Sequence, residues 1–263
     1  MEPPTDKKEL PHTSRYQHPD PLLRRLRLID GHGQPVDLSS TFRETKLVLF
    51  YFGSQWNASE SKGCQKIVSR LCRTYPHELK TVYVSVDSDF RLYEASTRNK
   101  PWLAMEWNDG SSVDLNLLPE ELEELDKERS ESYLLAGDED MGKNVVEKDI
   151  QGTSYVLPFS RVYMADLFDV VMTPHLAVYH LPTRTFLDKH VRLSRLGSSR
   201  YEATMETWLK GESSKPFNIV DMVFVAPWTC AMVFLALAYY VLLLVGGKQY
   251  HIQNILASLS QVR

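Results

Sequence analysis

The sequence predicts an α/β domain with a central mixed sheet, followed by one transmembrane helix. The domain is indicated by two apolar, β-prone runs, Lys46–Gly53 and Thr81–Asp87, which alternate with segments of helical spacing. Strands that alternate with helices are typical of a sheet with a parallel centre. The transmembrane helix is indicated by residues 222–247, a run of 26 residues without a charge, because about 20 apolar residues suffice to cross a bilayer.

The composition excludes several classes of protein and site. The 263 residues are 43% hydrophobic and 24% charged, which are ordinary globular values. The net charge of -4 leaves no basic excess for binding nucleic acid, so we expect no nucleic-acid partner. The three cysteines, Cys64, Cys72 and Cys230, are odd in number and unclustered, which argues against a disulfide framework or a cysteine zinc site. We predict no metal and no cofactor.

The chain divides by composition into five predicted parts. A polar N-terminal arm, expected to be disordered, covers residues 1–21, and the α/β domain covers residues 22–211. A linker at residues 212–221 leads to the transmembrane segment, residues 222–247. The last part, residues 248–263, has apolar residues at helical spacing, which fits either a short amphipathic helix at a membrane or partner surface, or a disordered tail.

The first half of the domain reads as alternating strands and helices. Residues 24–38 predict two short strands joined by a turn at Gly31–Gly33. The continuous apolar run that follows, from Lys46, is typical of a strand covered on both faces. A helix is predicted from Asn57 to Tyr75, because its apolar residues recur at helical spacing. The next buried strand begins at Thr81, and a polar helix-like stretch follows it.

The second half of the domain predicts a corner, a hairpin and a last helix. A helix ends before Thr173–Pro174, where the residue before proline favours an extended conformation. An alternating strand is predicted from His175 to His180, and Pro182 begins the turn to a closing strand, Thr185–Val191. The final helix is predicted over Ser199–Leu209.

An acidic insertion, residues 107–151, interrupts this pattern. It contains fourteen acidic and four basic residues, a net charge of -10. Residues 119–135 indicate an exposed acidic helix with Leu122, Leu125 and Leu134 as its apolar stripe. Two interpretations stay open: an insertion with a solvated face, or a docking surface for a basic partner.

Four local motifs carry a resemblance to a known family. They are LRLIDGHGQPVDLSS, LVLFYFGSQW, KPWLAMEW and VMTPHLAVY. With the order of strands and helices, they make residues Leu22 to Leu209, without the insertion, similar to the thioredoxin superfamily and in particular to its tryparedoxin and nucleoredoxin branch. The resemblance implies a thioredoxin-like fold with a cis bond before Pro174. It also implies that an extended peptide binds beside Trp56, Thr173, Pro174 and His175.

The chain departs from this family at the redox motif. The family has Trp-Cys-x-x-Cys, and the matching residues here are Trp56, Asn57, Ala58, Ser59 and Glu60. Neither the amide of Asn57 nor the carboxylate of Glu60 can exchange with a disulfide, so we expect no catalytic dithiol and no dithiol oxidoreductase activity. Cys64 lies about one helical turn further on and is the thiol left for one-cysteine chemistry.

We therefore expect a redox-inactive thioredoxin-like protein that acts as a protein-binding or structural module at a membrane. Two alternatives stay open: a one-cysteine oxidoreductase or peroxidase that uses Cys64, and an accessory subunit of a larger membrane complex. The N-terminus lacks the features of a signal or transit peptide, which predicts a tail anchor, Met222 to Gly247, with the domain in the cytosol. The mitochondrial outer membrane and the endoplasmic reticulum both fit, and the mitochondrial inner membrane stays open. The protein partner is not identified by the sequence.

Overall fold

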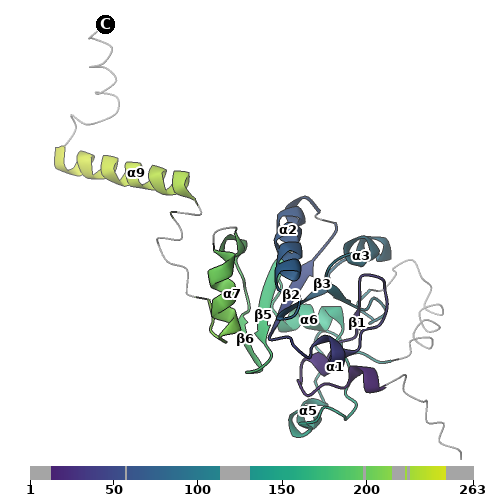
Figure 1. The fold of residues 1–263 in the computed structure, drawn as a ribbon. Coiled ribbons are helices and arrows are strands. Elements are labelled where there is room, and N and C mark those ends of the chain that lie inside the picture. Colours follow the sequence, from purple (N-terminus) through teal and green to yellow (C-terminus); the bar gives the residue numbers. More distant parts are fainter. Residues whose placement is uncertain are drawn as a thin grey trace, which may run out of the picture. The chain divides into compact units, whose positions relative to one another are not determined.

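The computed structural model describes residues 13–56, 58–112, 131–197, 200–214, 223 and 226–246. They belong to two compact units, residues 1–214 and residues 215–263, which are described separately. The first unit contains a sheet with helices packed against it (Figure 1). Residues 1–12 and the tail at 248–263 lie outside the described residues.

The sheet has six strands in the order β1-β4-β3-β2-β5-β6. Strands β2, β3 and β4 are parallel, whereas β5 runs antiparallel to β2, β6 to β5, and β1 to β4. The predicted mixed sheet with a parallel centre is therefore confirmed. The strands are β1 (Leu28–Ile29), β2 (Leu47–Gly53), β3 (Leu79–Ser85), β4 (Leu103–Met105), β5 (His175–His180) and β6 (Thr185–Asp188).

Helices cover both faces of the sheet. Val68 of α2 and Trp208 of α7 belong to the core on one face, and Met164 of α6 belongs to the core on the other, together with the N-terminal segment. The helices of this unit are α1 (Leu38–Thr41), α2 (Ala58–Thr74), α3 (Phe90–Thr97), α5 (Lys143–Lys148), α6 (Arg161–Leu167) and α7 (Tyr201–Leu209), with short 3-10 turns at Thr13–Tyr16, Leu23–Arg25 and Leu193–Leu196.

The central strands are buried on both faces. All seven residues of β2 are buried, as its continuous apolar sequence predicts. The expectation that β5 alternates between core and solvent is wrong, because five of its six residues are buried. Two polar side chains of β5 have hydrogen-bond partners within the protein: the Tyr179 hydroxyl donates to Asp20 at 2.9 Å, and His180 Nδ1 lies 2.8 Å from Thr183 Oγ1.

Three further details differ from the sequence prediction. The N-terminal arm is not disordered throughout, since Asp20 is buried and also accepts hydrogen bonds from two backbone N–H groups. The second of the two short N-terminal strands is reduced to a single bridge between Ile29 and Pro35. The segment Leu103–Met105, for which no strand was predicted, is β4 and pairs with both β1 and β3.

The acidic insertion is anchored by buried arginines. Residues 113–130 lie outside the described residues, and with them Leu122 and Leu125 of the predicted acidic helix. Leu134 is not helical, since it forms a parallel bridge with Phe159 and is buried. Three acids of the described part of the insertion pair with buried arginines: Glu131 with Arg27 at 2.5 Å, Asp140 with Arg25 at 2.6 Å, and Asp149 with Arg24 at 3.0 Å.

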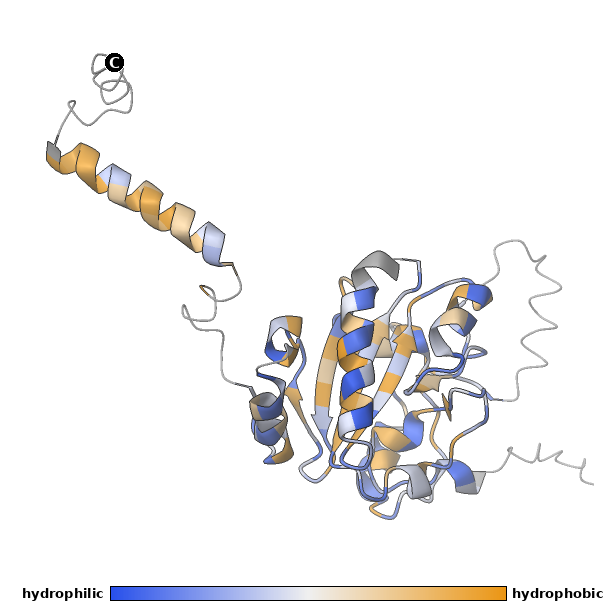
Figure 2. Cartoon of the chain, turned by 45° about the horizontal axis from the view of Figure 1, so that its top comes forward, coloured by the Kyte–Doolittle hydropathy of each residue, from blue (hydrophilic) through white to orange (hydrophobic). Residues whose placement is uncertain are grey.

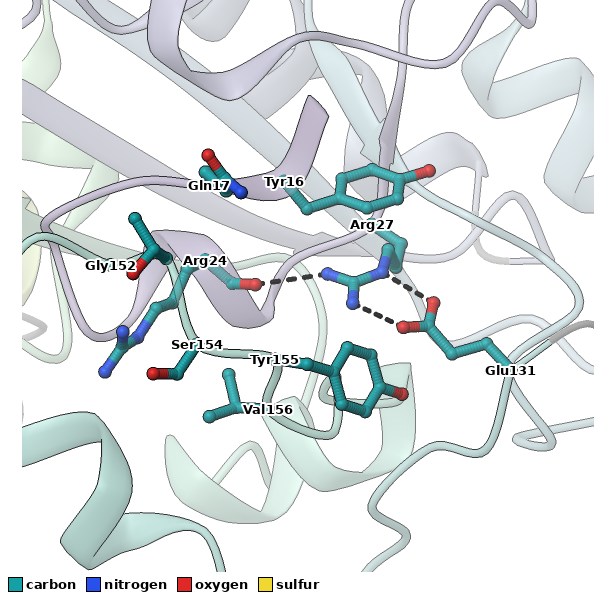
Figure 3. A pocket seen from close by; sticks show the side chains of 10 residues that line it. Tyr16, Gln17, Arg24, Arg27, Glu131, Gly152, Ser154, Tyr155 and Val156 are labelled. Atoms are coloured by element: carbon teal, nitrogen blue, oxygen red, sulfur yellow. Dashed lines mark hydrogen bonds and ion pairs between the residues drawn. The ribbon is translucent and has the colours of Figure 1, made fainter. Parts of the chain in front are cut away.

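Arg27 and Glu131 form an ion pair in the lining of a small cavity (Figure 3). The guanidinium of Arg27 donates to both carboxylate oxygens of Glu131 and lies 4.1 Å from the ring centroid of Tyr16. Such two-pronged bonds give geometric specificity as well as attraction. The pair therefore fixes where the chain returns from residues 113–130 to the domain.

The described residues of the second unit include an apolar helix, α9 (Pro227–Gly246). Pro227 is its first residue, a position where a missing N–H group costs nothing. The 20 residues extend about 30 Å at 1.5 Å per residue, and hydrophobic residues dominate its length (Figure 2). This helix is long and apolar enough to cross a membrane.

Candidate functional site: a groove at the ends of the central strands

The candidate site lies where the parallel strands β2 and β3 end and β5 begins. Gly53 and Ser85 are paired at the carboxyl ends of β2 and β3, and Phe52 is paired with His175 at the start of β5. The segments after β2, after β3 and before β5 therefore meet at one edge of the sheet. They line a groove of about 700 Å³ together with Leu92, and its lining comprises Ser54, Trp56, Val86, Asp87, Ser88, Leu92, Val170, Val171, Met172 and Thr173.

The rim of this groove is apolar and exposed. Trp56 is 83% exposed, Val171 90% and Met172 75%, although large apolar side chains are normally found inside a domain. They come from the segment after β2 and from the segment before β5, so they gather across the groove. Clustered exposed apolar residues of this kind mark interaction surfaces. We call this set, Trp56, Val171 and Met172, the apolar rim.

The floor of the groove is held by Asp87. Its Oδ1 accepts from the Ser54 hydroxyl at 2.5 Å, and its carboxylate accepts from the backbone N–H groups of Gln55 and Trp56 at 3.0 to 3.3 Å. Its Oδ2 also accepts from the Ser85 hydroxyl at 3.0 Å. Asp87 therefore satisfies the N–H groups of the loop that leads into α2, and it fixes the position of Trp56 on the rim.

The groove offers binding groups but no nucleophile of the expected kind. Among the described residues, its lining contains the hydroxyls of Ser54, Ser88 and Thr173 and the Asp87 carboxylate, but no cysteine, histidine or lysine. A serine or threonine becomes nucleophilic beside a general base such as histidine. The described lining therefore supplies polar and apolar contacts for a bound segment.

The predicted site residues are partly brought together. Trp56 and Thr173 line the groove, and the bond from Thr173 to Pro174 is cis, which confirms that expectation. His175 is not in the lining, because its ring packs against Phe52 and His190 at centroid distances of 5.5 and 4.8 Å. Asn57 and the side chain of Glu60 lie outside the described residues.

Cys64 is a core residue. Its exposed fraction is 0%, and it belongs to the same core cluster as Val68 and Leu71 of the same helix, α2. Burial raises the pKa of its thiol to about 12, although a hydrogen bond with Tyr51 opposes this. Thiolates rather than thiols are nucleophilic. One-cysteine chemistry is therefore disfavoured at this position.

We expect Cys64 to be unreactive in the folded protein. A pKa near 12 lowers the thiolate fraction at neutral pH on the order of a thousandfold relative to a free cysteine. Alkylation by iodoacetamide, followed by mass spectrometry of the folded full chain, should leave Cys64 unmodified until denaturant is added. Alkylation of native Cys64 at the rate of a free cysteine would reopen the one-cysteine alternative.

His175 should make the stability of the domain depend on pH. Burial lowers its pKa, and the nearby His190 lowers it further. The folded state thus binds this proton less readily than the unfolded state, so the stabilisation is present above about pH 6.5 and is lost as the pH falls below that value. We expect His175→Gln to reduce the loss in free energy of unfolding between pH 7.5 and 5.5. His32→Gln, which removes an exposed histidine, should leave that loss as in the wild type. An equal loss in free energy of unfolding between pH 7.5 and 5.5 for the wild type and both variants would contradict this role of His175.

A buried ion pair beneath the groove was missed by sequence reasoning. Arg161 and Asp109 are 2% and 1% exposed, and Arg161 Nε lies 3.1 Å from Asp109 Oδ2. The same guanidinium donates to the carbonyl oxygens of Ser85 and Asp87 at 3.5 and 3.4 Å. It thereby links the start of the insertion to the floor of the groove. An arginine directly after the helix-capping Ser160, in an otherwise apolar stretch, is the signal that could have found it.

The strand order decides the fold. Three parallel strands at the centre, β5 and β6 antiparallel beside them, and helices on both faces match the arrangement that the sequence resemblance implied. The domain has a thioredoxin-like fold. The acidic insertion lies between β4 and α6 of this thioredoxin-like domain.

Comparisons with known proteins agree on similarity at the level of structure. Tryparedoxin I from Crithidia fasciculata is 16% identical, with 68% of this chain and 89% of that chain covered and a TM-score of 0.42. Thioredoxin from Wuchereria bancrofti is 14% identical, with 71% and 96% covered and a TM-score of 0.38. A tryparedoxin 1 structure is 15% identical, with 75% and 97% covered and a TM-score of 0.42. No protein-family profile and no curated protein matches the chain.

Proposed function

We propose that this protein is a redox-inactive, thioredoxin-like binding module held at a membrane by α9. The apolar rim carries the proposal: three large, exposed side chains lie at a groove whose described lining has no cysteine. Exposed tryptophans contribute strongly to binding when a partner buries them. The partner we propose is a protein segment with apolar side chains that fill the groove beside Trp56.

The proposed anchor follows from α9. The helix is long and apolar enough to cross a bilayer, and none of its residues from Pro227 to Gly246 is charged. A helix that is hydrophobic all round requires burial in protein or lipid. Most of its large side chains are exposed within the described residues, among them Trp228, Phe234 and Leu244, so lipid is the surrounding that we propose.

Photocrosslinking from the rim tests the binding proposal. We would place p-benzoyl-phenylalanine at Val171 in the full chain, expressed in cells, and irradiate the membrane fraction. We expect a discrete adduct that weakens at least several-fold when Trp56→Ser removes the neighbouring aromatic side chain.

Met141 provides the matched control, because it is as exposed as Trp56 but does not line the groove. The same crosslinker at Met141 should give no such adduct. Equal adducts from Val171 and Met141 would argue against a specific groove. Adducts from α9 positions alone would instead favour an accessory subunit of a membrane complex.

A further inference from the structure

The exposed side of α2 carries a row of bases that the groove does not use. Lys62, Lys66, Arg70 and Arg73 recur at intervals of four, four and three residues, which places them within an arc of about 80° along about 16 Å of helix. They line a shallow groove of about 480 Å³ whose other residues are uncharged. Hydrophilic residues follow the side of α2 that faces the viewer in Figure 2. We call these four residues the basic row.

Arg70 of the basic row has a structural role, whereas the side chains of the other three residues are exposed. Arg70 donates to the Leu196 carbonyl at 2.6 Å and lies 4.4 Å from the ring centroid of Tyr201, so it holds α2 against α7. Lys62, Lys66 and Arg73 are exposed, and no ion pair among the described residues includes them. Like charges four residues apart destabilise a helix. An external anion bound to the row would therefore reduce the repulsion among these basic side chains.

The surrounding charge favours an extended anionic surface over a single small anion. Residues 189–197, which contact α2 through the Leu196 carbonyl, contain three bases and no acid. Acids border one end of the row, because Glu78, Glu202 and Glu206 act on Tyr75 and Glu202 accepts a hydrogen bond from the Tyr201 hydroxyl. The whole chain has a net charge of -4, so this positive region is local.

We infer that the basic row docks on the anionic lipid headgroups of the membrane that holds α9. The inference rests on the proposed membrane anchor. Only residues 215–226 separate Ser214 from α9, which is at most about 40 Å of extended chain. A tether of that length keeps the domain at a high effective concentration near the bilayer. Basic side chains within a Debye length of anionic lipid are attracted to it.

Lysine acetylation of the full chain tests the inference. The protein is inserted from outside into vesicles of phosphatidylcholine alone, or of phosphatidylcholine with 30% phosphatidylserine, and is treated with a membrane-impermeant acetylating reagent. We expect Lys62 and Lys66 to react at least fivefold more slowly on the phosphatidylserine vesicles, and 0.5 M NaCl to remove the difference. Lys143 and Lys148, which are exposed on α5, are internal controls and should react equally on both.

Two variants sharpen the result. Arg73→Gln should reduce the protection of Lys62 and Lys66, whereas Arg91→Gln, an exposed arginine on α3, should not. Equal acetylation of Lys62 and Lys66 on both kinds of vesicle overturns the inference. Protection of these lysines on phosphatidylcholine vesicles that increases with protein concentration also overturns it, because such protection indicates contact with another protein. Flotation after alkaline carbonate tests the membrane anchor α9 separately. If carbonate washes the chain off the vesicles while Lys62 and Lys66 stay protected on phosphatidylserine vesicles, the anchor is refuted but the docking of the basic row is not.

Discussion

Replacing Arg161 by leucine should cost about 3–5 kcal/mol of the free energy of unfolding, because it leaves the Asp109 carboxylate buried without its partner. Both side chains are almost fully buried, and the Arg161 guanidinium also donates to Asp109 Oδ1, the Trp107 carbonyl and the Ser112 hydroxyl. Urea unfolding of the full chain in detergent, followed by tryptophan fluorescence, measures the loss. Since Arg161 also binds the backbone at Ser85 and Asp87, crosslinking from Val171 should weaken with it.

An exposed ion pair provides the matched control for this variant. Arg98 and Glu94 lie 2.8 Å apart on the surface of α3, with side chains 69% and 45% exposed. Arg98→Leu should cost no more than about 0.5 kcal/mol. Adding Asp109→Asn to Arg161→Leu should recover part of the loss, because the unpaired charge is removed. Equal losses from Arg161→Leu and Arg98→Leu would show that the buried pair does not stabilise the domain.

Replacing Leu237 by arginine should release much of the protein from membranes. Leu237 lies near the middle of α9, where an arginine costs about 2.5–3.5 kcal/mol of insertion free energy. This corresponds to a decrease on the order of a hundredfold in the ratio of inserted to free chains. Extraction with alkaline carbonate, followed by immunoblotting of pellet and supernatant, measures that ratio.

Val245→Arg is the control for insertion. Val245 lies one residue before the end of α9, where a long basic side chain can reach the aqueous interface. We expect this variant to stay in the carbonate pellet. If the Leu237→Arg protein pellets as completely as the wild type, α9 does not span a bilayer.

The strands and the apolar helix could be predicted because their signals are local. The run from Leu47 to Gly53 is apolar throughout, which only a strand covered on both faces explains. The uncharged run that contains α9 is longer than most buried helices require. The order of these elements, with the motifs around Trp56 and Pro174, was enough for the thioredoxin-like fold.

The sequence predictions failed where contacts between residues far apart in the sequence determine which side chains are buried or paired. The polar atoms of Tyr179 and His180 suggested contact with solvent, but Asp20 and Thr183 are their hydrogen-bond partners. The ion pair between Glu131 and Arg27 could not be predicted, because 104 positions separate the two residues in the sequence. Composition likewise could not show that Val171 and Met172 stand exposed beside Trp56.

Crosslinking from Val171 in a full chain without cysteines tests the central proposal most directly. The variant carries Cys64→Ser, Cys72→Ser and Cys230→Ser, which removes every thiol in the sequence. If the groove binds its partner through the apolar rim alone, the cysteine-free chain gives the same adduct in the same yield as the wild type. An adduct that disappears with the cysteines, and returns when Cys64 alone is restored, would show that binding depends on sulfur chemistry and would contradict a redox-inactive module.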